Sequence, residues 1–141
     1  MAAINFFSEE IPFKLNHPRK TARWIKNAIQ SERSELQSLN LIFCKDTHLR
    51  KINLQYLNHD TYTDIVTFDQ SEGSGQITGD IFISITRVKE NSVNFNVSFD
   101  NELHRVIIHG VLHLIGYGDK TIKSKAIMRK KEDAYLSLLI K

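Results

Sequence analysis

Two histidines, His109 and His113, stand four positions apart in an uncharged stretch of the chain. On a helix, a four-residue step leaves the two imidazoles roughly 40° apart on one face. Their Cβ atoms would be about 5–6 Å apart, so both side chains could direct a nitrogen at one metal ion. Asp119 follows in the next loop and offers a carboxylate as a third ligand. This spacing predicts a catalytic, zinc-type site whose fourth position stays open.

The alternative is a pair of core histidines bonded to backbone or carboxylate groups. No Asp, Glu, Lys or Arg occurs from 106 to 117, so a helix there would be buried, and a buried imidazole needs a partner. Gly116 lies on the histidine face, and Gly118 just beyond the helix is a natural residue to follow its end, because glycine tolerates a positive φ. Because these glycines let the chain turn back toward the histidines, they favour the metal site.

The residue after the first histidine disfavours a peptidase. Metalloproteases of the HExxH type carry a glutamate general base there, and this chain has Gly110, which cannot transfer a proton. A water activated by a metal could still serve as nucleophile without that glutamate. Hydrolysis of another bond type is therefore the better hypothesis.

Length, charge and cysteine content limit the class of protein. A chain of 141 residues with a net charge of +3 suits one globular domain, 1–141. No segment approaches the ~20 apolar residues of a membrane span, and no secretion signal is expected, because residues 1–5 contain neither a basic region nor a long apolar run. Cys44 is the only cysteine and is expected to be buried in a strand. A cytoplasmic location is expected.

A basic cluster begins immediately after Asp119. Its members are Lys120, Lys123, Lys125, Arg129, Lys130 and Lys131. A cationic rim beside a hydrolytic metal suits a polyanionic substrate, because phosphate contacts dominate nucleic-acid affinity. The alternative is an ordinary solvated helix face.

Hydrophobic periodicity and turn residues predict an α/β domain with a mixed sheet. Strands are expected near 4–7, 38–45, 65–68 and 77–85. Helices are expected near 18–33, 47–57, 86–94, 100–117 and from 120 or 121 to 140. The initial strand–helix–strand order predicts a crossover and a parallel pair, and the loop 71–75 predicts a hairpin.

Three segments resemble the YbeY family of metal-dependent endoribonucleases. The stretch 109–117, His-Gly-Val-Leu-His-Leu-Ile-Gly-Tyr, resembles the family signature His-Gly-x-Leu-His-Leu-x-Gly-Tyr-Asp-His. Asn53 with 63–68, and the stretch 79–84, match two further family segments in order and spacing. The resemblance covers roughly residues 40–135. It implies one domain with a four-stranded mixed sheet, about five helices, and the metal site on a buried central helix.

The resemblance also implies a function. The activity would be single-strand-specific cleavage of ribosomal RNA, in maturation of the small-subunit 3′ end and in ribosome quality control. His109, His113 and Asp119 would hold one divalent ion, zinc first, with manganese, iron or nickel as alternatives. The partners would be single-stranded ribosomal RNA and the ribosome or small-subunit ribosomal proteins, without membrane or DNA. The competing hypothesis is a non-catalytic ribosome assembly factor with a structural metal.

Two positions depart from the family pattern. Asp119 replaces the third histidine, and because a carboxylate neutralises part of the metal's charge, weaker Lewis acidity or a shift toward manganese or iron is expected. Leu57 replaces the usual arginine, and a leucine cannot stabilise charge on a phosphate. His59 and Lys120 are the candidate catalytic residues for that role.

Three further side chains are candidates for RNA contacts. Arg105 is expected to help the basic cluster to hold the RNA backbone. Tyr62 or Tyr117 could stack on an unpaired base, although both are more often packing residues. His104, in contrast, points roughly 140° away from His109 around the helix, so we expect it to be structural.

Overall fold

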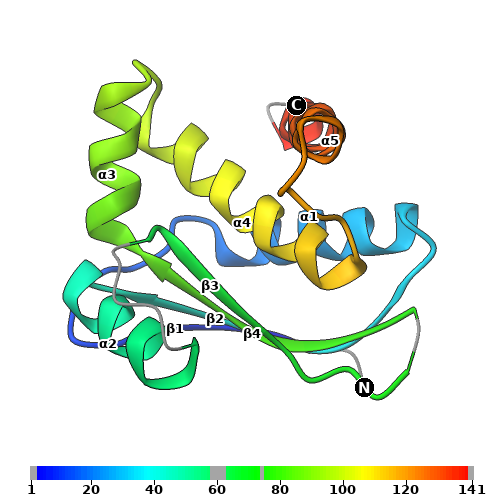
Figure 1. Ribbon diagram of the computed structural model, residues 1–141, viewed down its shortest axis with the longest axis horizontal. Helices are drawn as coiled ribbons and strands as arrows, with labels where there is room; N and C mark the ends of the chain where they lie inside the picture. Colours follow the sequence, from blue (N-terminus) through cyan, green and yellow to red (C-terminus); the bar gives the residue numbers. More distant parts are fainter. Residues whose placement is uncertain (1–2, 58–62, 74, 140–141) are drawn as a thin grey trace.

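The computed structural model describes residues 3–57, 63–73 and 75–139, which form a sheet with helices on both faces (Figure 1). The strands are β1 (Ala3–Ser8), β2 (Glu35–Cys44), β3 (Ile65–Asp69) and β4 (Gln76–Ser84). The helices are α1 (Pro18–Ser31), α2 (Asp46–Leu57), α3 (Ile85–Asn94), α4 (Phe99–Ile115) and α5 (Ile122–Leu139). The predicted fold class, a four-stranded mixed sheet with about five helices, is confirmed.

The sheet has the strand order β1-β2-β4-β3. β2 pairs in parallel with β1 and β4, whereas β3 and β4 are antiparallel, so the predicted parallel pair and hairpin are both confirmed. β2 begins at Glu35, three residues before the predicted start. Its pairing with β4 shifts register between Leu36 and Ser38, and this irregularity breaks the alternation by which a strand is recognised.

The two faces of the sheet carry different cores. Leu39, Leu41 and Phe43 of β2 point into the larger core beneath α1 and α4. Cys44 points to the opposite face and packs with Leu49 of α2 in a smaller cluster. Cys44 is fully buried, as predicted, and burial raises the pKa of its thiol to about 12. Figure 1 shows α1 and α4 above the sheet and α2 below it.

α4 lies close against the sheet because a glycine stands at the contact. A Cβ at Gly110 would come within 2.6 Å of Ile65 Cδ1 and 3.1 Å of Ile81 Cγ2. Since real Cβ atoms do not approach so closely, any side chain at this position would require Ile65 and Ile81 to shift, or the helix to move outward. Gly110 therefore allows these two side chains to pack directly against the helix that carries both histidines.

The chain turns sharply between α4 and α5. Gly116 ends α4 with a φ of 128°, and Tyr117 N donates to Leu112 O at 3.0 Å. The expected helix end at Tyr117, followed by Gly118, is wrong, because α4 ends two residues earlier and Gly116 takes the positive φ. α5 begins at Ile122, and reciprocal hydrogen bonds between Thr121 and Ser124 fix its first turn. Asp119 is thus held on a short, fixed connection.

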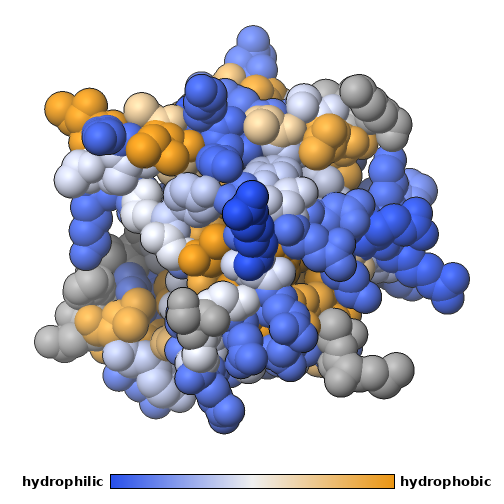
Figure 2. Space-filling model, turned by 90° about the vertical axis from the view of Figure 1, so that its right-hand side faces the viewer, coloured by the Kyte–Doolittle hydropathy of each residue, from blue (hydrophilic) through white to orange (hydrophobic). Residues whose placement is uncertain are grey.

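The surface is mixed in character. Figure 2 shows one face of the molecule, on which hydrophilic side chains dominate and hydrophobic ones form small separate patches. Among the described residues, no helix has the length and apolar character needed to cross a membrane.

Candidate metal centre and the adjoining cleft

The three predicted ligand atoms converge. His109 Nε2 and His113 Nε2 are 2.9 Å apart, and each lies 3.3 Å from Asp119 Oδ2. Ligand atoms bound to one tetrahedral ion at about 2.0–2.1 Å would be separated by roughly 3.3–3.4 Å, so the spacing fits a metal with little adjustment. In the described ranges, no fourth His, Cys, Asp or Glu completes the set. Three ligands and an open position are typical of a catalytic site.

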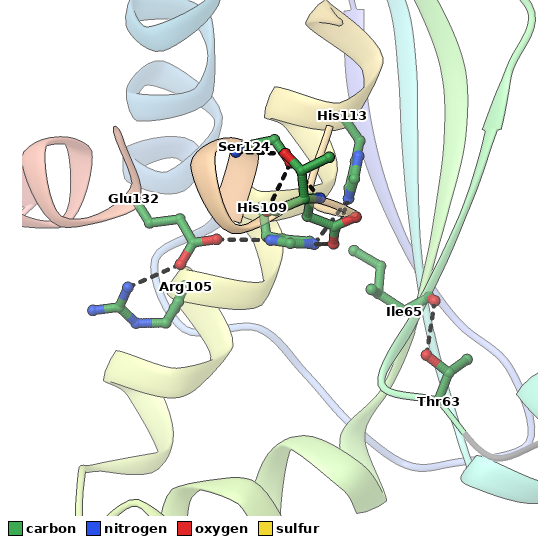
Figure 3. A network of polar contacts seen from close by, with 9 residues as sticks. Thr63, Ile65, Arg105, His109, His113, Ser124 and Glu132 are labelled. Carbon is green, nitrogen blue, oxygen red and sulfur yellow. Dashed lines mark hydrogen bonds and ion pairs between the residues drawn. The ribbon is translucent and has the colours of Figure 1, made fainter. Parts of the chain in front are cut away.

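Glu132 supports the first ligand from behind. Its Oε2 lies 2.7 Å from His109 Nδ1, and its side chain is only 6% exposed (Figure 3). A proton on Nδ1, donated to this carboxylate, leaves the Nε2 lone pair facing His113 and Asp119. Carboxylate–imidazole–metal arrangements of this kind fix the tautomer and increase ligand basicity. Glu132 is therefore part of the candidate centre.

Arg105 holds that carboxylate in place. Its Nη1 donates to Glu132 Oε1 at 2.9 Å, and its Nη2 donates to Asp133 Oδ1 at 2.7 Å. The sequence suggested Arg105 as a contact for the RNA backbone. Because the guanidinium is instead occupied by two carboxylates of α5, the structure gives it an internal supporting role.

The surroundings of the histidines are electronegative. Burial lowers the pKa of His109, but the hydrogen bond and charge of Glu132, with the charges of Asp119 and Asp64, outweigh it and raise the pKa. Burial also raises the pKa of Asp64, against the opposing charge of His109. Asp64 Oδ2 accepts a hydrogen bond from Asn91 at 3.4 Å. Such an environment favours a bound cation between the histidines.

A second carboxylate anchors the connection that carries Asp119. Glu32, at the end of α1, accepts hydrogen bonds from Tyr117 Oη at 2.5 Å, from Tyr135 Oη, and from Lys131 Nζ at 3.1 Å. Burial raises the pKa of Glu32, but these hydrogen bonds and the charge of Lys131 outweigh it and hold the pKa below its ordinary value. Tyr117 is therefore engaged internally, and α1 is tied to α5.

A cleft of about 260 Å³ opens beside the candidate centre. Its lining includes His109 and Asp119, and three further acids lie in its wall, Asp64, Glu102 and Glu132. Three other side chains border the same cleft: Phe95, Lys125 and Arg129. The space therefore connects the predicted ligands with two cations of the basic cluster and one aromatic ring.

The other candidate residues either do not line the cleft or lie outside the described residues. Lys120 is exposed, directly after Asp119, but it is not among the described residues that line the cleft. His59 and Tyr62 lie outside the described residues. Leu57 is the last residue of α2, the helix below the sheet, and is 41% exposed. His104 Nδ1 lies 2.6 Å from Asp100 O, and its ring meets that of Trp24 edge-on, in keeping with a structural role.

Two functional candidates escaped sequence analysis. Glu132 was detectable in principle, because it is the first acid after the basic cluster on a helix that begins close to Asp119. Phe95 gave no signal, since a single phenylalanine between helices is usually a packing residue. Only its position on the rim of the cleft distinguishes it.

Comparison with known proteins gives a consistent result. The family model described as Endoribonuclease YbeY matches residues 3–139. A relative from Amoebophilus asiaticus named Endoribonuclease YbeY is 49% identical over 96% of this chain and 92% of its own length. One of the same name from Christiangramia forsetii is 50% identical over 96% and 93%. A solution structure of a Thermotoga maritima protein superposes with a TM-score of 0.67 at 26% identity, covering 97% of this chain and 89% of that one.

Proposed function

Because the chain belongs to the endoribonuclease YbeY family and is a metal-dependent, RNA-cleaving hydrolase, we propose that its substrate is single-stranded ribosomal RNA. The reaction would mature the 3′ end of the small-subunit RNA and contribute to ribosome quality control. The proposed domain is the whole chain, 1–141. Its partners would be the ribosome or small-subunit ribosomal proteins, and its location the cytoplasm, where bacterial ribosomes reside.

The convergence of His109, His113 and Asp119 carries the proposal. Lewis acidity at the scissile phosphate and activation of a water molecule are what a divalent ion supplies at such a site when bound. Zinc is the first expectation, and Asp119, a harder ligand than histidine, would favour manganese or iron, with nickel as a further alternative. Glu132 holds the proton on His109 Nδ1 and so keeps the opposite nitrogen free for the ion.

Because Leu57 carries no charge, another residue must stabilise the negative charge on the phosphate during the reaction. Lys120 follows a ligand directly and is exposed, so it remains a candidate catalytic residue for this role. His59 remains a second candidate on sequence grounds. If the Lys120→Ala and His59→Ala variants both cleaved RNA like the unmodified protein, neither assignment would stand.

A second candidate function is a non-catalytic assembly factor with a structural metal. Leu57 favours it, because the position lacks the cation that usually serves the phosphate. The open coordination position speaks against it, because structural zinc sites have four protein ligands. The two functions differ in one observable, the cleavage of RNA.

The deciding experiment is cleavage of a labelled single-stranded RNA, with chelator, with metal added back, and with the His113→Ala variant. We expect the chelator to abolish cleavage and metal to restore it. The variant should lose more than about 100-fold, beyond the usual cost of losing a partner behind a ligand. His48→Ala, on the opposite face of the sheet, is the matched control. Absence of cleavage with every metal would favour the assembly factor, and metal analysis of the purified protein identifies the ion.

A further inference from the structure

Phe95 presents its ring to solvent at the edge of the cleft. It is 64% exposed, and in the described part of the chain no other aromatic ring stacks against it. Its backbone is nevertheless fixed, because Phe95 N donates to Asn91 O at 2.9 Å and Val97 N donates to Ser92 O at 3.0 Å. Asn96 completes the turn with a φ of 55°. An exposed ring on a fixed backbone beside a nuclease centre suits a planar ligand.

Two cations border the same cleft from α5. Lys125 and Arg129 are four residues apart, so both lie on one side of the helix, and both are exposed. Among the described residues, neither cation forms an ion pair with a carboxylate. Lys131, by contrast, is bound to Glu32. The two free cations are therefore available to an anionic ligand.

The acids of the cleft determine which part of a nucleotide can lie where. Of the residues that the structure describes, four acids line the cleft. Asp119 faces the two histidines and Glu132 is bound to His109 and Arg105, so Asp64 and Glu102 are the two that would repel a phosphate from their wall. Lys125 and Arg129 attract one to the α5 side, and Phe95 offers an apolar face for a base. The volume, about 260 Å³, is slightly below that of sites for drug-sized ligands and leaves room for a small group.

From this juxtaposition we propose that the cleft is a subsite for one unpaired nucleotide of the RNA, adjacent to the scissile phosphate. Its base stacks on Phe95, and its phosphate binds between Lys125 and Arg129. The inference rests on the proposed function in one respect, that the scissile bond lies at His109, His113 and Asp119. It explains single-strand preference physically, because bases within a duplex are already stacked and cannot reach the ring. The subsite also places Lys125 and Arg129 near the centre, whereas Leu57 contributes no positive charge.

Binding without cleavage tests the base contact. Fluorescence anisotropy would follow a labelled six-nucleotide single-stranded RNA on protein kept metal-free with chelator. Phe95→Ala should bind it roughly 5- to 100-fold more weakly, the cost of one lost stacking contact, and Phe95→Trp should restore binding. Val93→Ala is the matched control, because Val93 is 76% exposed near the end of α3, two residues before Phe95, but outside the lining of this cleft. Equal RNA binding by Phe95→Ala and the unmodified protein would overturn the proposal.

Inorganic polyphosphate distinguishes stacking from charge. It has no base, so Phe95→Ala should bind it normally, whereas Arg129→Gln and Lys125→Gln should bind both polyanions more weakly. Each should lower the slope of log affinity against log salt for RNA by about 0.7. Lys130→Gln, on the same helix but outside the lining, is the control. Two results would contradict the proposed subsite. One is a Phe95→Ala variant that binds polyphosphate as weakly, relative to the unmodified protein, as it binds RNA. The other is a Lys130→Gln variant that loses as much binding as Arg129→Gln. Because no metal is present, failure of the proposed cleavage reaction would leave these results unchanged.

Discussion

Glu132 and Glu32 are chemically alike but serve different parts of the molecule. Their side chains are 6% and 8% exposed, so burial does not distinguish them. Their donors do: Glu132 is bound by His109 and Arg105, whereas two tyrosines and a lysine bind Glu32. The first carboxylate acts on a candidate ligand, and the second joins α1 to α5 and the turn between α4 and α5. The partner, not the carboxylate, determines whether such a group tunes chemistry or fixes shape.

If Glu32 fixes the shape of the protein and Glu132 acts on a ligand, substitution of Glu32 should reduce stability more than substitution of Glu132. We expect Glu32→Ala to lower the free energy of unfolding by about 2–4 kcal/mol, because it leaves two tyrosine hydroxyls without their acceptor. The contribution of Lys131 is small, because that side chain is 39% exposed. Urea unfolding measures the change, with the exposed Glu35→Ala as control. A decrease in the free energy of unfolding of less than about 0.5 kcal/mol would lie within the range of ordinary surface substitutions and would contradict the structural role of Glu32.

Loss of Glu132 should instead affect metal affinity. We expect Glu132→Gln to weaken zinc binding roughly 10- to 100-fold, because an amide holds the His109 tautomer less well. Competition with a chromophoric chelator measures this. Asp133→Asn is the matched control, because Asp133 binds the same Arg105 without touching a histidine. Equal effects of the two variants would mean that Arg105, not the contact with His109, matters.

The turn between the two networks should be sensitive to one glycine only. Gly116→Ala should cost about 1–2 kcal/mol of stability, because a φ of 128° is unfavourable for a residue with a Cβ. Gly118→Ala should be nearly neutral, since Gly118 has no positive φ and a Cβ there would meet no atom within 4 Å. Thermal unfolding of the two variants gives the comparison, and equal shifts would contradict the assignment of the turn.

The smallest expected effect is a dependence on pH. Because the folded-state pKa of Glu32 is below its ordinary value of 4.5, the ionised carboxylate stabilises the fold above that value. This stabilisation is lost as the pH falls through the folded-state pKa. The difference in stability between the unmodified protein and Glu32→Gln should therefore be full at neutral pH and shrink below about pH 4.5. A stability difference that increased on acidification would contradict a lowered pKa of Glu32 in the folded protein.

Sequence reasoning succeeded where the relevant spacing was local. His109 and His113 are one helical turn apart and Asp119 follows the next turn, so helix geometry was enough to bring them together. The sheet and its hairpin followed from alternation and turn residues. Both glycines were assigned to the turn, but Gly118 was placed directly after the helix, because two nearby glycines look alike until the hydrogen bond from Tyr117 N to Leu112 O selects Gly116.

What failed depended on tertiary packing. Glu32 and Tyr117 are 85 positions apart, and no local pattern links them. Arg105 looked like a free cation for RNA, because its partners Glu132 and Asp133 lie on another helix. Phe95 was not singled out, since hydrophobicity does not tell which side of a loop faces a cleft.

The contact between Gly110 and the sheet limits what this scaffold can evolve into. Substitution of Gly110 by glutamate would give the chain the HExxH pattern of metalloproteases. The new side chain, however, would project into Ile65 and Ile81 rather than toward the ligands. A change to peptidase chemistry would therefore require Ile65 and Ile81 to repack as well, although the two sequence patterns differ at one position.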